Sequence, residues 1–477
     1  MPLIDPVPVI PAAELGQVHF IAIGGAGMSG IARAFADLGM TVSGSDGKDS
    51  ETLRSLAAHG ITTHVGHDAT QLGDADTVVI SSAIGEHNVE LVAARERGLR
   101  ILHRSAALAS LMTRPQARGV AVGGTHGKTT TSAWIAVALT AAGRDPSYVI
   151  GAPLAAAAGI PAGTSAHLGK GPEIVVEADE SDQTFLQYPA DVVVVTNVEA
   201  DHLDNWLTPQ AYAEGFARFV TGDRVSAVVL NLDDPGAAAL ADRVRPDTTV
   251  ITYGETDGAD VQITDLDLGP DRTRAVIRHA DGTGGAVRLS VLGRHNVSNA
   301  AAAYAVARVV GVDDVGARRA LERFAGTSRR FQPVGEVHQI RVYDDYAHNP
   351  TKVRAALTAA RAAAGRGRLI VCFQPHLYTR TRDFADRFAE ALSLADEVVV
   401  MDVYAAREDP IPGVTGELIA KDVTTVRGKP AHYVPDWDEA ARATALLAKP
   451  WDLVLTVGAG DVTEIGPKIV AALEERR

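Results

Sequence analysis

The 477-residue sequence predicts an α/β fold of three domains, with helices on both faces of mostly parallel sheets. The first reason is a recurring unit, in which a short run rich in Val and Ile is followed by a Gly-containing turn and an Ala/Leu-rich helical pattern. The second is length, because domains of roughly 150 residues would give about three. The third is that polar stretches near residues 113–115 and 326–330 separate the units into blocks 1–112, 113–326 and 327–477.

Each block has its own strand candidates. Those of the first block are residues 18–23, 41–42, 77–80 and 101–102, and a helical pattern at 106–112 ends before Pro115, since proline disfavours further helix. Those of the second block are residues 120–122, 174–176, 192–195 and 227–230. Those of the third block are residues 337–343, 369–373, 398–401 and 453–457.

Composition excludes several classes of protein. Lys and Arg number 45 against 59 Asp and Glu, a net charge of −14 that argues against binding a nucleic-acid backbone. Cys372 is the single cysteine, so no internal disulfide can form. No apolar run approaches the ~18 residues of a membrane helix, and the first basic side chain is Arg33, so no secretory signal is expected. We predict a cytoplasmic protein with no nucleic-acid or membrane partner, and its oligomeric state is left open.

A glycine-rich motif, GTHGKTT at residues 124–130, follows the apolar run 120–122 and precedes a helix expected to begin near Thr131. In this order of strand, loop and helix, backbone N–H groups surround phosphate oxygens, with Lys128 near the terminal phosphates and Thr129 on Mg²⁺. The standard spacing would place its first glycine at position 122, which is Val122. The motif is therefore predicted to be a shortened phosphate loop, and the alternative is a Gly-rich turn without a ligand.

Acidic residues follow two further strands of the same block. The strand at residues 174–176 is followed by Glu177, Asp179, Glu180 and Asp182. The strand at residues 192–195 is followed by Asn197, Glu199, Asp201, His202 and Asp204. Ligands of open α/β sheets bind at the carboxyl ends of the strands, where the phosphate loop also lies. Mg²⁺ takes only one or two protein ligands beside phosphates and water, so we expect Glu177 and His202 to contact it, His202 being the less typical ligand. The alternative is a solvated acidic rim.

The first block carries GAGMSG at residues 25–30, directly after residues 18–23, with Asp46 about 20 residues further on. This spacing fits a Rossmann-like pyrophosphate site, in which glycines let the backbone approach the ligand and Asp46 lies near a ribose or its equivalent. Two alternatives remain open. The glycines could serve only tight strand-to-helix packing, or the motif could bind NAD in an oxidoreductase, which would leave the phosphate loop unexplained.

Polar side chains also follow the strands of the third block. The strand at residues 369–373 is followed by Gln374, His376, Tyr378 and Arg380. The guanidinium group of Arg380 is suited to binding a carboxylate. For Arg382 and Glu408 the alternative is that they are ordinary surface residues with no part in a site. Another polar loop spans residues 344–350. At residues 294–299 an Ala-rich helix begins, and spacing alone predicts only Asn296 or Ser298 as its cap.

Six motifs together resemble the Mur ligase family. They are GTHGKTTT at 124–131, EADESD at 177–182, TNVEADHLD at 196–204, GRHNVSNA at 293–300, DDYAHNP at 344–350 and QPHLYTRT at 374–381. The resemblance spans nearly the whole chain and keeps the family order. It implies a Rossmann-like N-terminal domain that binds a UDP-sugar, a P-loop ATPase-like central domain and a Rossmann-like C-terminal domain that receives an amino acid.

The resemblance also implies roles for single residues. For the UDP-sugar these are Gly24, Gly25, Ala26, Gly27, Met28, Ser29, Gly30, Asp46, Ser82 and Arg104. For ATP they are Gly124, Thr125, His126, Gly127, Lys128, Thr129, Thr130, His295, Asn296 and Asp345. For the metal they are Thr129, Glu177 and His202, and for the amino acid Tyr346, His348, His376 and Arg380. Lys128, Glu177, His202, His348 and Arg380 are the expected catalytic residues.

The activity implied by the resemblance is the ATP-dependent joining of L-alanine to UDP-N-acetylmuramate, with Mg²⁺, in peptidoglycan precursor synthesis. Residues 203–225 contain no lysine, so the carbamylated lysine of several Mur ligases has no counterpart, which fits the alanine-adding branch. Leu377 replaces an arginine often found in the family. Two other functions remain open, namely addition of a recycled murein tripeptide to the same sugar nucleotide and a binding protein that uses ATP only to change shape.

Overall fold

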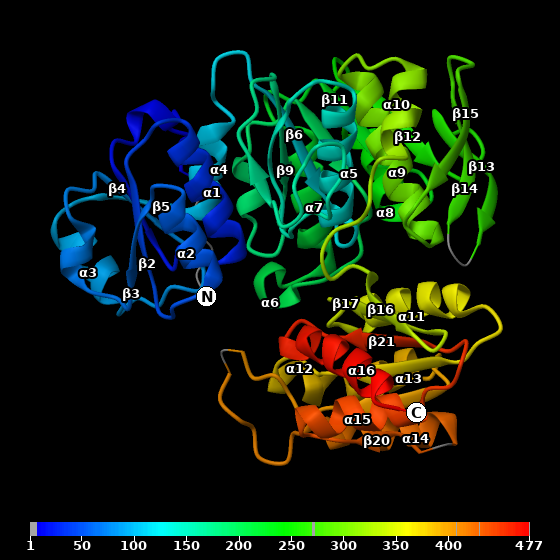
Figure 1. Ribbon diagram of the computed structural model, residues 1–477. Coiled ribbons are helices and arrows are strands. Elements are labelled where there is room, and N and C mark those ends of the chain that lie inside the picture. The colour runs from blue at the N-terminus through cyan, green and yellow to red at the C-terminus, as the bar shows by residue number, and fades with distance from the viewer. Residues whose placement is uncertain (1–6, 270–271, 407, 429, 477) are drawn as a thin grey trace. The chain divides into compact units, whose positions relative to one another are not determined.

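A computed structural model describes residues 7–269, 272–406, 408–428 and 430–476, without the side chains of Ala26 and Asp204. The chain forms two compact units. The first comprises Met1–Leu266, Ala275–Leu289 and His295–Ala325, and the second comprises Asp267–Arg274, Ser290–Arg294 and Gly326–Arg477. Both are α/β, with three sheets in all among the described residues, which confirms the predicted fold class (Figure 1). Within the described part of the chain, no helix is both long and apolar enough to cross a bilayer.

The N-terminal sheet has five parallel strands in the order β3-β2-β1-β4-β5. They are β1 (Val18–Ile21), β2 (Val42–Asp46), β3 (Thr62–Val65), β4 (Thr77–Ile80) and β5 (Arg100–His103). The helices are η1 (Ala12–Glu14), α1 (Ala26–Asp37), α2 (Glu51–Ala58), η2 (Ala69–Leu72), α3 (Val89–Glu96) and α4 (Arg104–Leu111). Side chains of β1 alternate between two cores, Phe20 facing α1, α2 and α4 and Ile21 facing η2 and α3. The strand order reverses between β1 and β4, which is where such sheets bind ligands.

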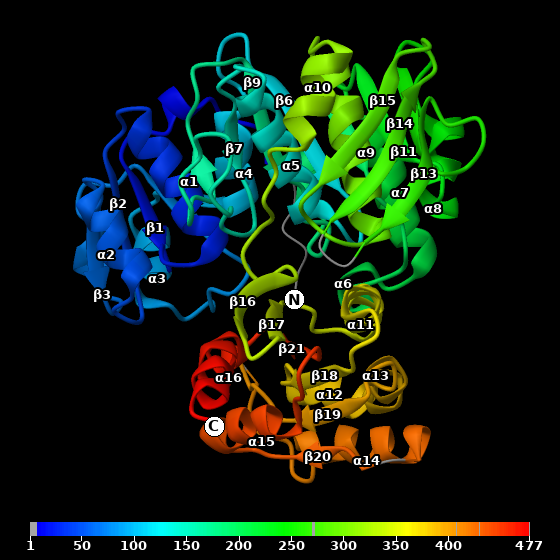
Figure 2. The ribbon, with the colours of Figure 1, turned by 45° about the vertical axis from the view of Figure 1, so that its right-hand side comes forward.

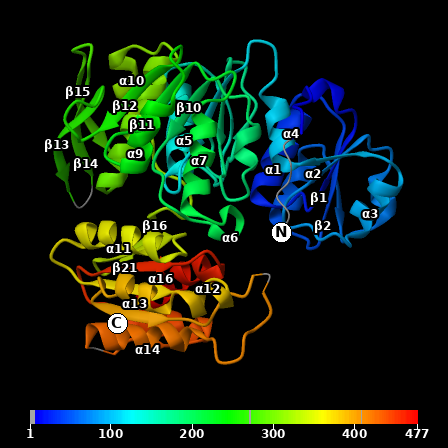
Figure 3. The same ribbon diagram turned by 180° about the vertical axis from the view of Figure 1, so that it is seen from behind.

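The central sheet has ten strands in the order β15-β14-β13-β12-β11-β10-β6-β9-β7-β8. They are β6 (Arg118–Gly123), β7 (Ser147–Val149), β8 (Ala166–His167), β9 (Glu173–Glu177), β10 (Val192–Val195), β11 (Ala227–Asn231), β12 (Thr249–Gly254), β13 (Val261–Leu268), β14 (Thr273–His279) and β15 (Gly284–Leu289). The four predicted strands lie within β6, β9, β10 and β11. Figure 3 shows β13, β14 and β15 at one edge of this sheet. The sequence reading missed these three strands, whose faces are partly exposed and carry no buried apolar run.

The helices of this region are α5 (Lys128–Ala141), η3 (Thr184–Gln187), α6 (Leu203–Trp206), α7 (Pro209–Val220), α8 (Pro235–Ala238), η4 (Ala239–Arg243), α9 (Arg294–Val309) and α10 (Asp314–Leu321). Two predicted helix starts were wrong. Helix α5 begins at Lys128, three residues before Thr131, because Gly127 adopts a left-handed conformation (φ 84°) that turns the loop directly into the helix. Helix α9 begins at Arg294, so Asn296 and Ser298 lie inside it and cannot cap it.

The C-terminal sheet has six strands in the order β16-β17-β21-β18-β19-β20. They are β16 (Gln332–Val337), β17 (Ile340–Asp345), β18 (Leu369–Phe373), β19 (Glu397–Val400), β20 (His432–Tyr433) and β21 (Leu453–Val457). The strand predicted at residues 337–343 is confirmed over residues 340–343, which belong to β17, but its predicted start was wrong because Val337 ends β16. His338 and Gln339 both have positive φ (49° and 65°) and form the turn of an antiparallel hairpin between β16 and β17.

The helices of the second unit are α11 (Pro350–Ala364), α12 (Tyr378–Asp383), α13 (Ala385–Leu392), α14 (Gly416–Arg427), α15 (Trp437–Leu447), η5 (Asp461–Glu464) and α16 (Ile465–Glu474). Figure 2 shows α15 and α16 on one side of the strands and α11 and α13 on the other. Strands β18, β19 and β21 are buried because both faces are covered, which is why they were readable as continuous apolar runs.

Candidate active site

The phosphate loop connects β6 to α5. Gly124 has φ 133°, and a Cβ there would lie 2.0 Å from Thr196 Oγ1, so no other residue fits. A Cβ at Gly127 would lie 2.8 Å from Asn299 Oδ1. These two glycines therefore let the loop backbone pass between the end of β10 and the start of α9. The start of α5 then exposes backbone N–H groups, the arrangement that receives phosphate oxygens.

Lys128 lies in a buried acidic environment within this loop. Its Nζ is 2.6 Å from Glu180 Oε2 and donates to Gly124 O at the same distance, and the Glu180 side chain is fully buried. Burial raises the pKa of Glu180. Burial alone would lower the pKa of Lys128, but the carboxylates of Glu180, Asp179 and Glu177 outweigh it, and that pKa is raised. Lys128 is therefore held as a cation in the loop.

Thr129 and Glu177 bring two oxygen donors together. The Thr129 hydroxyl donates to Glu177 Oε1 at 3.0 Å, and Glu177 Oε2 accepts a hydrogen bond from Gly151 N at 2.9 Å. Glu177 is the last residue of β9, so the sheet fixes its backbone. Carboxylate and hydroxyl oxygens are the donors that Mg²⁺ prefers. Among the residues that the structure describes, no group of three or more His, Cys, Asp or Glu side chains is arranged around a metal position.

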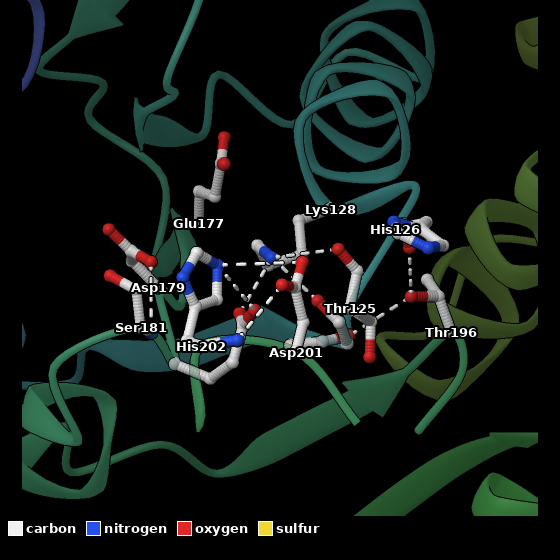
Figure 4. Close-up of polar contacts among 12 residues, drawn as sticks. Thr125, His126, Lys128, Glu177, Asp179, Ser181, Thr196, Asp201 and His202 are labelled. Carbon is white, nitrogen blue, oxygen red and sulfur yellow. Dashed lines mark hydrogen bonds and ion pairs between the residues drawn. The ribbon is translucent and has the colours of Figure 1, made fainter. Parts of the chain in front are cut away.

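The structure places His202 beside the carboxylates of Asp201 and Glu180. Its Nε2 lies 3.7 Å from Asp201 Oδ2 (Figure 4) and 4.0 Å from Glu180 Oε1. The hydrogen bonds of Glu177 are instead with Thr129 and Gly151. His202 has φ 52° and precedes α6, which carries Trp206 back to the acidic segment, where its Nε1 donates to Glu180 O at 2.9 Å. The two acidic segments predicted from sequence thus meet around Lys128.

The Gly-rich loop of the first block meets Asp46 at the end of β2. Gly24 N donates to Asp46 Oδ2 at 2.9 Å, and a Cβ at Gly24 would lie 2.8 Å from that oxygen. A Cβ at Gly27 would lie 3.2 Å from Arg104 Nη1. A Cβ at Gly30 would lie 3.1 Å from Ala166 Cβ and 3.4 Å from Val149 Cγ1, so this glycine allows close packing of α1 on β7 and β8.

Other members of the predicted UDP-sugar set differ in what they can offer. Met28 and Ser29 are buried in helix α1, and Met28 belongs to the first hydrophobic core. Gly25 is the residue before α1, and its carbonyl accepts from the N–H groups of Met28 and Ser29. The side chain of Ala26 lies outside the described residues. For this stretch, backbone groups are what the loop can present to a ligand.

Arg104 and Ser82 lie between the Gly-rich loop and the acidic segment after β9. Arg104 Nη2 donates to Asp179 Oδ2 at 2.8 Å, and Ser82 Oγ donates to Asp182 Oδ2 at 3.0 Å. Burial would raise the pKa of Asp179, but Arg104 and Lys128 lower it well below its ordinary value. His103 is buried beside Ser82, and burial lowers its pKa to about 4. Two predicted UDP-sugar residues therefore lie beside the acidic segment that follows β9, within the first unit.

Helix α9 brings the predicted nucleotide residues to the start of α5. Asn299 Oδ1 accepts from Thr131 Oγ1 at 3.1 Å, and Asn299 Nδ2 donates to Asn296 Oδ1 at 3.3 Å. Asn296 is buried and His295 is exposed. Of these two predicted residues, only His295 is open to solvent as it stands.

In the second unit, four predicted residues form one cluster. The rings of Tyr346 and His348 are 5.1 Å apart, and those of His348 and His376 are 5.7 Å apart. Arg380 Nη1 lies 3.3 Å from His376 Nδ1 and donates to His348 O at 3.4 Å. His348 Nδ1 donates to Tyr346 O at 2.9 Å, which leaves Nε2 as the proton acceptor of the neutral ring. Burial lowers the pKa of His348 well below its ordinary value.

Asp345, at the end of β17, already has backbone partners. Its two oxygens accept hydrogen bonds from Phe331 N at 2.9 Å and Ala347 N at 2.8 Å. Burial raises the pKa of this carboxyl group. Asp345 therefore shapes the loop that carries Tyr346 and His348. Leu377 has φ 72°, a backbone conformation that is strained for leucine, directly between His376 and α12.

Comparisons with known proteins agree with this arrangement. The family models named Mur ligase family, catalytic domain, Mur ligase middle domain, and Mur ligase, glutamate ligase domain match residues 17–115, 122–307 and 329–460. A protein of Cutibacterium acnes named UDP-N-acetylmuramate–L-alanine ligase is 54% identical over 477 residues, covering 99% of each chain. The chain belongs to the Mur ligase family. Its ATP-dependence follows from that membership.

Two further relatives resemble this Mur ligase along its whole length. A Thermobifida fusca protein of the same name is 50% identical over 483 residues, covering 99% of this chain and 100% of the relative. The crystal structure of a UDP-N-acetylmuramate-alanine ligase from Thermotoga maritima has a TM-score of 0.81 at 29% identity, covering 97% and 100% of the two chains. The three-domain α/β architecture is thus shared along the full chain.

Three residues of this Mur ligase contact the candidate site in the structure but were not predicted as site residues from the sequence. Glu180 was one of several acids in its segment, and nothing in the spacing singled it out as the partner of Lys128. Tyr212 lies on the apolar side of α7, and its hydroxyl is 2.9 Å from Thr125 Oγ1 and donates to Glu180 Oε1 at 3.4 Å. Asn299 lies within the motif at residues 293–300, and the sequence pattern predicted no role for it. A polar atom on an otherwise apolar helix face is the one signal that could have pointed to Tyr212.

Proposed function

We propose that this chain is the ATP-dependent ligase that joins L-alanine to UDP-N-acetylmuramate in peptidoglycan precursor synthesis. The observation that carries this proposal is 54% identity over 99% of both chains to a protein named for that reaction. Residues 1–112 would bind the UDP-sugar, residues 113–326 ATP, and residues 327–477 the amino acid. These boundaries and a cytoplasmic location stay predictions.

The reaction requires activation of a carboxylate, because its negative charge repels the amine and oxide is a poor leaving group. In the proposed sequence, the γ-phosphoryl group of ATP passes to the muramate carboxylate, and the L-alanine amine attacks the acyl phosphate. The tetrahedral intermediate then collapses to amide, with ADP and phosphate as the other products. Lys128 would offset charge on the transferring group, which is the main task of a protein in phosphoryl transfer.

The donors around Thr129 are suited to Mg²⁺. Thr129 and Glu177 supply the hydroxyl and carboxylate oxygens that a hard cation prefers, and they are already within 3.0 Å of each other. When bound, Mg²⁺ would neutralise negative charge on the phosphates of ATP. His202 is proposed as a further ligand, and in this structure its imidazole is directed toward Glu180 and Asp201.

The UDP-sugar is proposed to lie on the loop of residues 24–30. Asp46 fixes the first turn of that loop through Gly24 N, and the nearby guanidinium of Arg104 is a suitable partner for a diphosphate or carboxylate oxygen. Because Arg104 also contacts Asp179, a sugar nucleotide held there would lie beside the acidic segment that surrounds Lys128. That adjacency is what transfer of phosphate to the sugar carboxylate requires.

For the amino acid, the cluster in the second unit offers an anion partner and a base. Arg380 would bind the carboxylate of L-alanine. Nε2 of His348 is the free acceptor of a neutral ring and would take a proton from the incoming ammonium, with His376 as the alternative. His295, Asn296 and Asp345 are proposed to lie around the base and ribose of ATP, together with the loop residues 124–130.

A phosphate-release assay tests the proposal. Release should require ATP, UDP-N-acetylmuramate and L-alanine together, and omission of any one should abolish amide formation. With ¹⁸O in the muramate carboxylate, one labelled oxygen should appear in the released phosphate. Unlabelled phosphate would contradict an acyl-phosphate route, and use of a tripeptide in place of L-alanine would identify the recycling ligase instead.

A further inference from the structure

The first unit contains a cavity whose lining includes none of the residues proposed above to bind a substrate or the metal. It measures about 550 Å³ and is lined by residues 11–13, Leu38, Met40, residues 113–117 and residues 170–172. This volume falls within the range of small-molecule sites. The cavity therefore has the size of a ligand site, and no part of the proposed reaction uses it.

The cavity lies at the amino-terminal ends of the strands, whereas the proposed substrate sites lie at their carboxyl ends. Its walls precede strands, with Met40 before β2, residues 113–117 before β6 and residues 170–172 before β9. The substrate residues follow the same strands, as Asp46, Lys128 and Glu177 do. Strand β6 has six residues, so its two ends are about 20 Å apart. A molecule bound in the cavity would leave the substrate sites free.

The chemistry of the walls indicates an amphipathic anion. Leu38, Met40 and the prolines and alanines of the lining segments are apolar, whereas Arg114 and Lys170 are the charged residues among them. The Arg114 Nη2 group donates to Ser147 Oγ at 2.8 Å. Its Nε is buried and has no hydrogen-bond partner among the described residues. Burial also lowers the pKa of Arg114. The guanidinium of Arg114 and the ammonium of Lys170, both at the wall of a largely apolar cavity, are cationic donors suited to a carboxylate.

We propose that this cavity, which we call the linker pocket, binds a small carboxylate with an apolar body, in addition to the three substrates of the ligase. The carboxylate would accept hydrogen bonds from the Arg114 guanidinium and the Lys170 ammonium, and the apolar body would lie against Leu38 and Met40. This site does not depend on the proposed reaction, because none of its lining residues belongs to the nucleotide or amino-acid sites.

Calorimetric titration of the full chain with octanoate tests the linker pocket, with octan-1-ol as the uncharged probe. We expect one octanoate per chain, bound at least tenfold more tightly than octan-1-ol. Binding should persist with saturating AMP-PNP and UDP-N-acetylmuramate. Equal binding of the alcohol would overturn the proposal, and so would displacement of octanoate by the nucleotides.

Variants then locate the bound probe. Arg114→Met should weaken octanoate binding at least tenfold, and Ala13→Phe should do the same by filling the cavity from an exposed position, which tests the site even if the loss of Arg114 impairs folding. The matched control is Arg245→Met, which removes another guanidinium whose Nε is buried, away from this cavity. Unchanged binding in Ala13→Phe, or equal weakening in Arg245→Met, would refute the assignment.

Discussion

The ammonium of Lys128 lies 2.6 Å from Glu180 Oε2, and the Glu180 side chain is fully buried. A buried ion pair contributes little net stability, but removal of one partner leaves an uncompensated charge. Glu180 thus fixes the position of the lysine before any nucleotide binds. The same pair links the strand that ends at Glu177 to the helix that begins at Lys128.

Loss of Lys128 should affect both activity and stability. We expect Lys128→Ala to lower kcat at least about 100-fold, since a charge that stabilises the transferring group is gone. The unfolding free energy should fall by about 3 kcal/mol because Glu180 is left buried and unpaired. Adding Glu180→Gln should restore part of the stability and none of the activity. Lys421→Ala, which breaks an exposed pair with Glu417, is the control in thermal unfolding and should have no measurable effect.

Dependence on Mg²⁺ should change with Thr129. Thr129→Ala removes a hydroxyl that lies 3.0 Å from Glu177, and we expect the Mg²⁺ concentration at half-maximal activity to rise at least about tenfold. Thr129→Ser keeps the oxygen and should stay near the wild type. Thr140→Ala, in the same helix, is the control, since its hydroxyl donates to the backbone at Ala136 O and not to Glu177. An unchanged Mg²⁺ titration for Thr129→Ala would show that this oxygen is not a ligand.

Arg104 should control the affinity for the sugar nucleotide. We expect Arg104→Met to raise the KM for UDP-N-acetylmuramate about tenfold or more, the size of a lost charge-assisted hydrogen bond, and to change the KM for ATP much less. Steady-state kinetics with each substrate varied in turn measures the difference. Arg95→Met removes an exposed arginine paired with Glu86 and should leave both constants unchanged. Equal increases for the two substrates would indicate a general structural defect.

Stability should fall on mild acidification because of His103. Burial lowers the pKa of this histidine to about 4, so below its ordinary value of about 6.5 the unfolded chain takes up a proton that the folded chain does not. Its stabilising contribution is present at pH 7 and is lost as the pH falls towards 4. Between pH 7 and 5 the loss of unfolding free energy should be about 2 kcal/mol smaller in His103→Gln than in the wild type. His87→Gln, at an exposed histidine, should follow the wild type in denaturant titrations.

Recognition of the amino acid should depend on Arg380. Arg380→Ala is expected to raise the KM for L-alanine at least tenfold with little change in the KM for ATP, because a guanidinium that pairs with a carboxylate is lost. Arg380→Lys should recover only part of the effect, since an ammonium cannot reproduce the planar contact. The exposed Arg382, which pairs with Asp383, provides the control Arg382→Ala. Parallel increases in both constants would remove Arg380 from the alanine site.

The sequence by itself determined the fold class and the residue types of the candidate site. Buried parallel strands such as β10 are continuous apolar runs, and the phosphate loop follows its strand directly, so both are local patterns in the chain. The same locality explains why Tyr346 and His348, two residues apart, were expected together. What was missed had no such pattern, as the partly exposed strands β13, β14 and β15 show.

Only the tertiary structure decided which of the acidic residues face the basic ones. Lys128 and Glu180 are 52 positions apart, and they meet because β6 and β9 are neighbours in the central sheet. Arg104 and Asp179 are 75 positions apart and follow strands of two different sheets, so their contact depends on how those sheets pack within the first unit. The hairpin between β16 and β17 likewise depends on two residues with positive φ that no composition signals. The linker pocket is a further case, since its walls come from segments that precede different strands. Contacts between distant segments depend on how elements pack, which local sequence patterns do not encode.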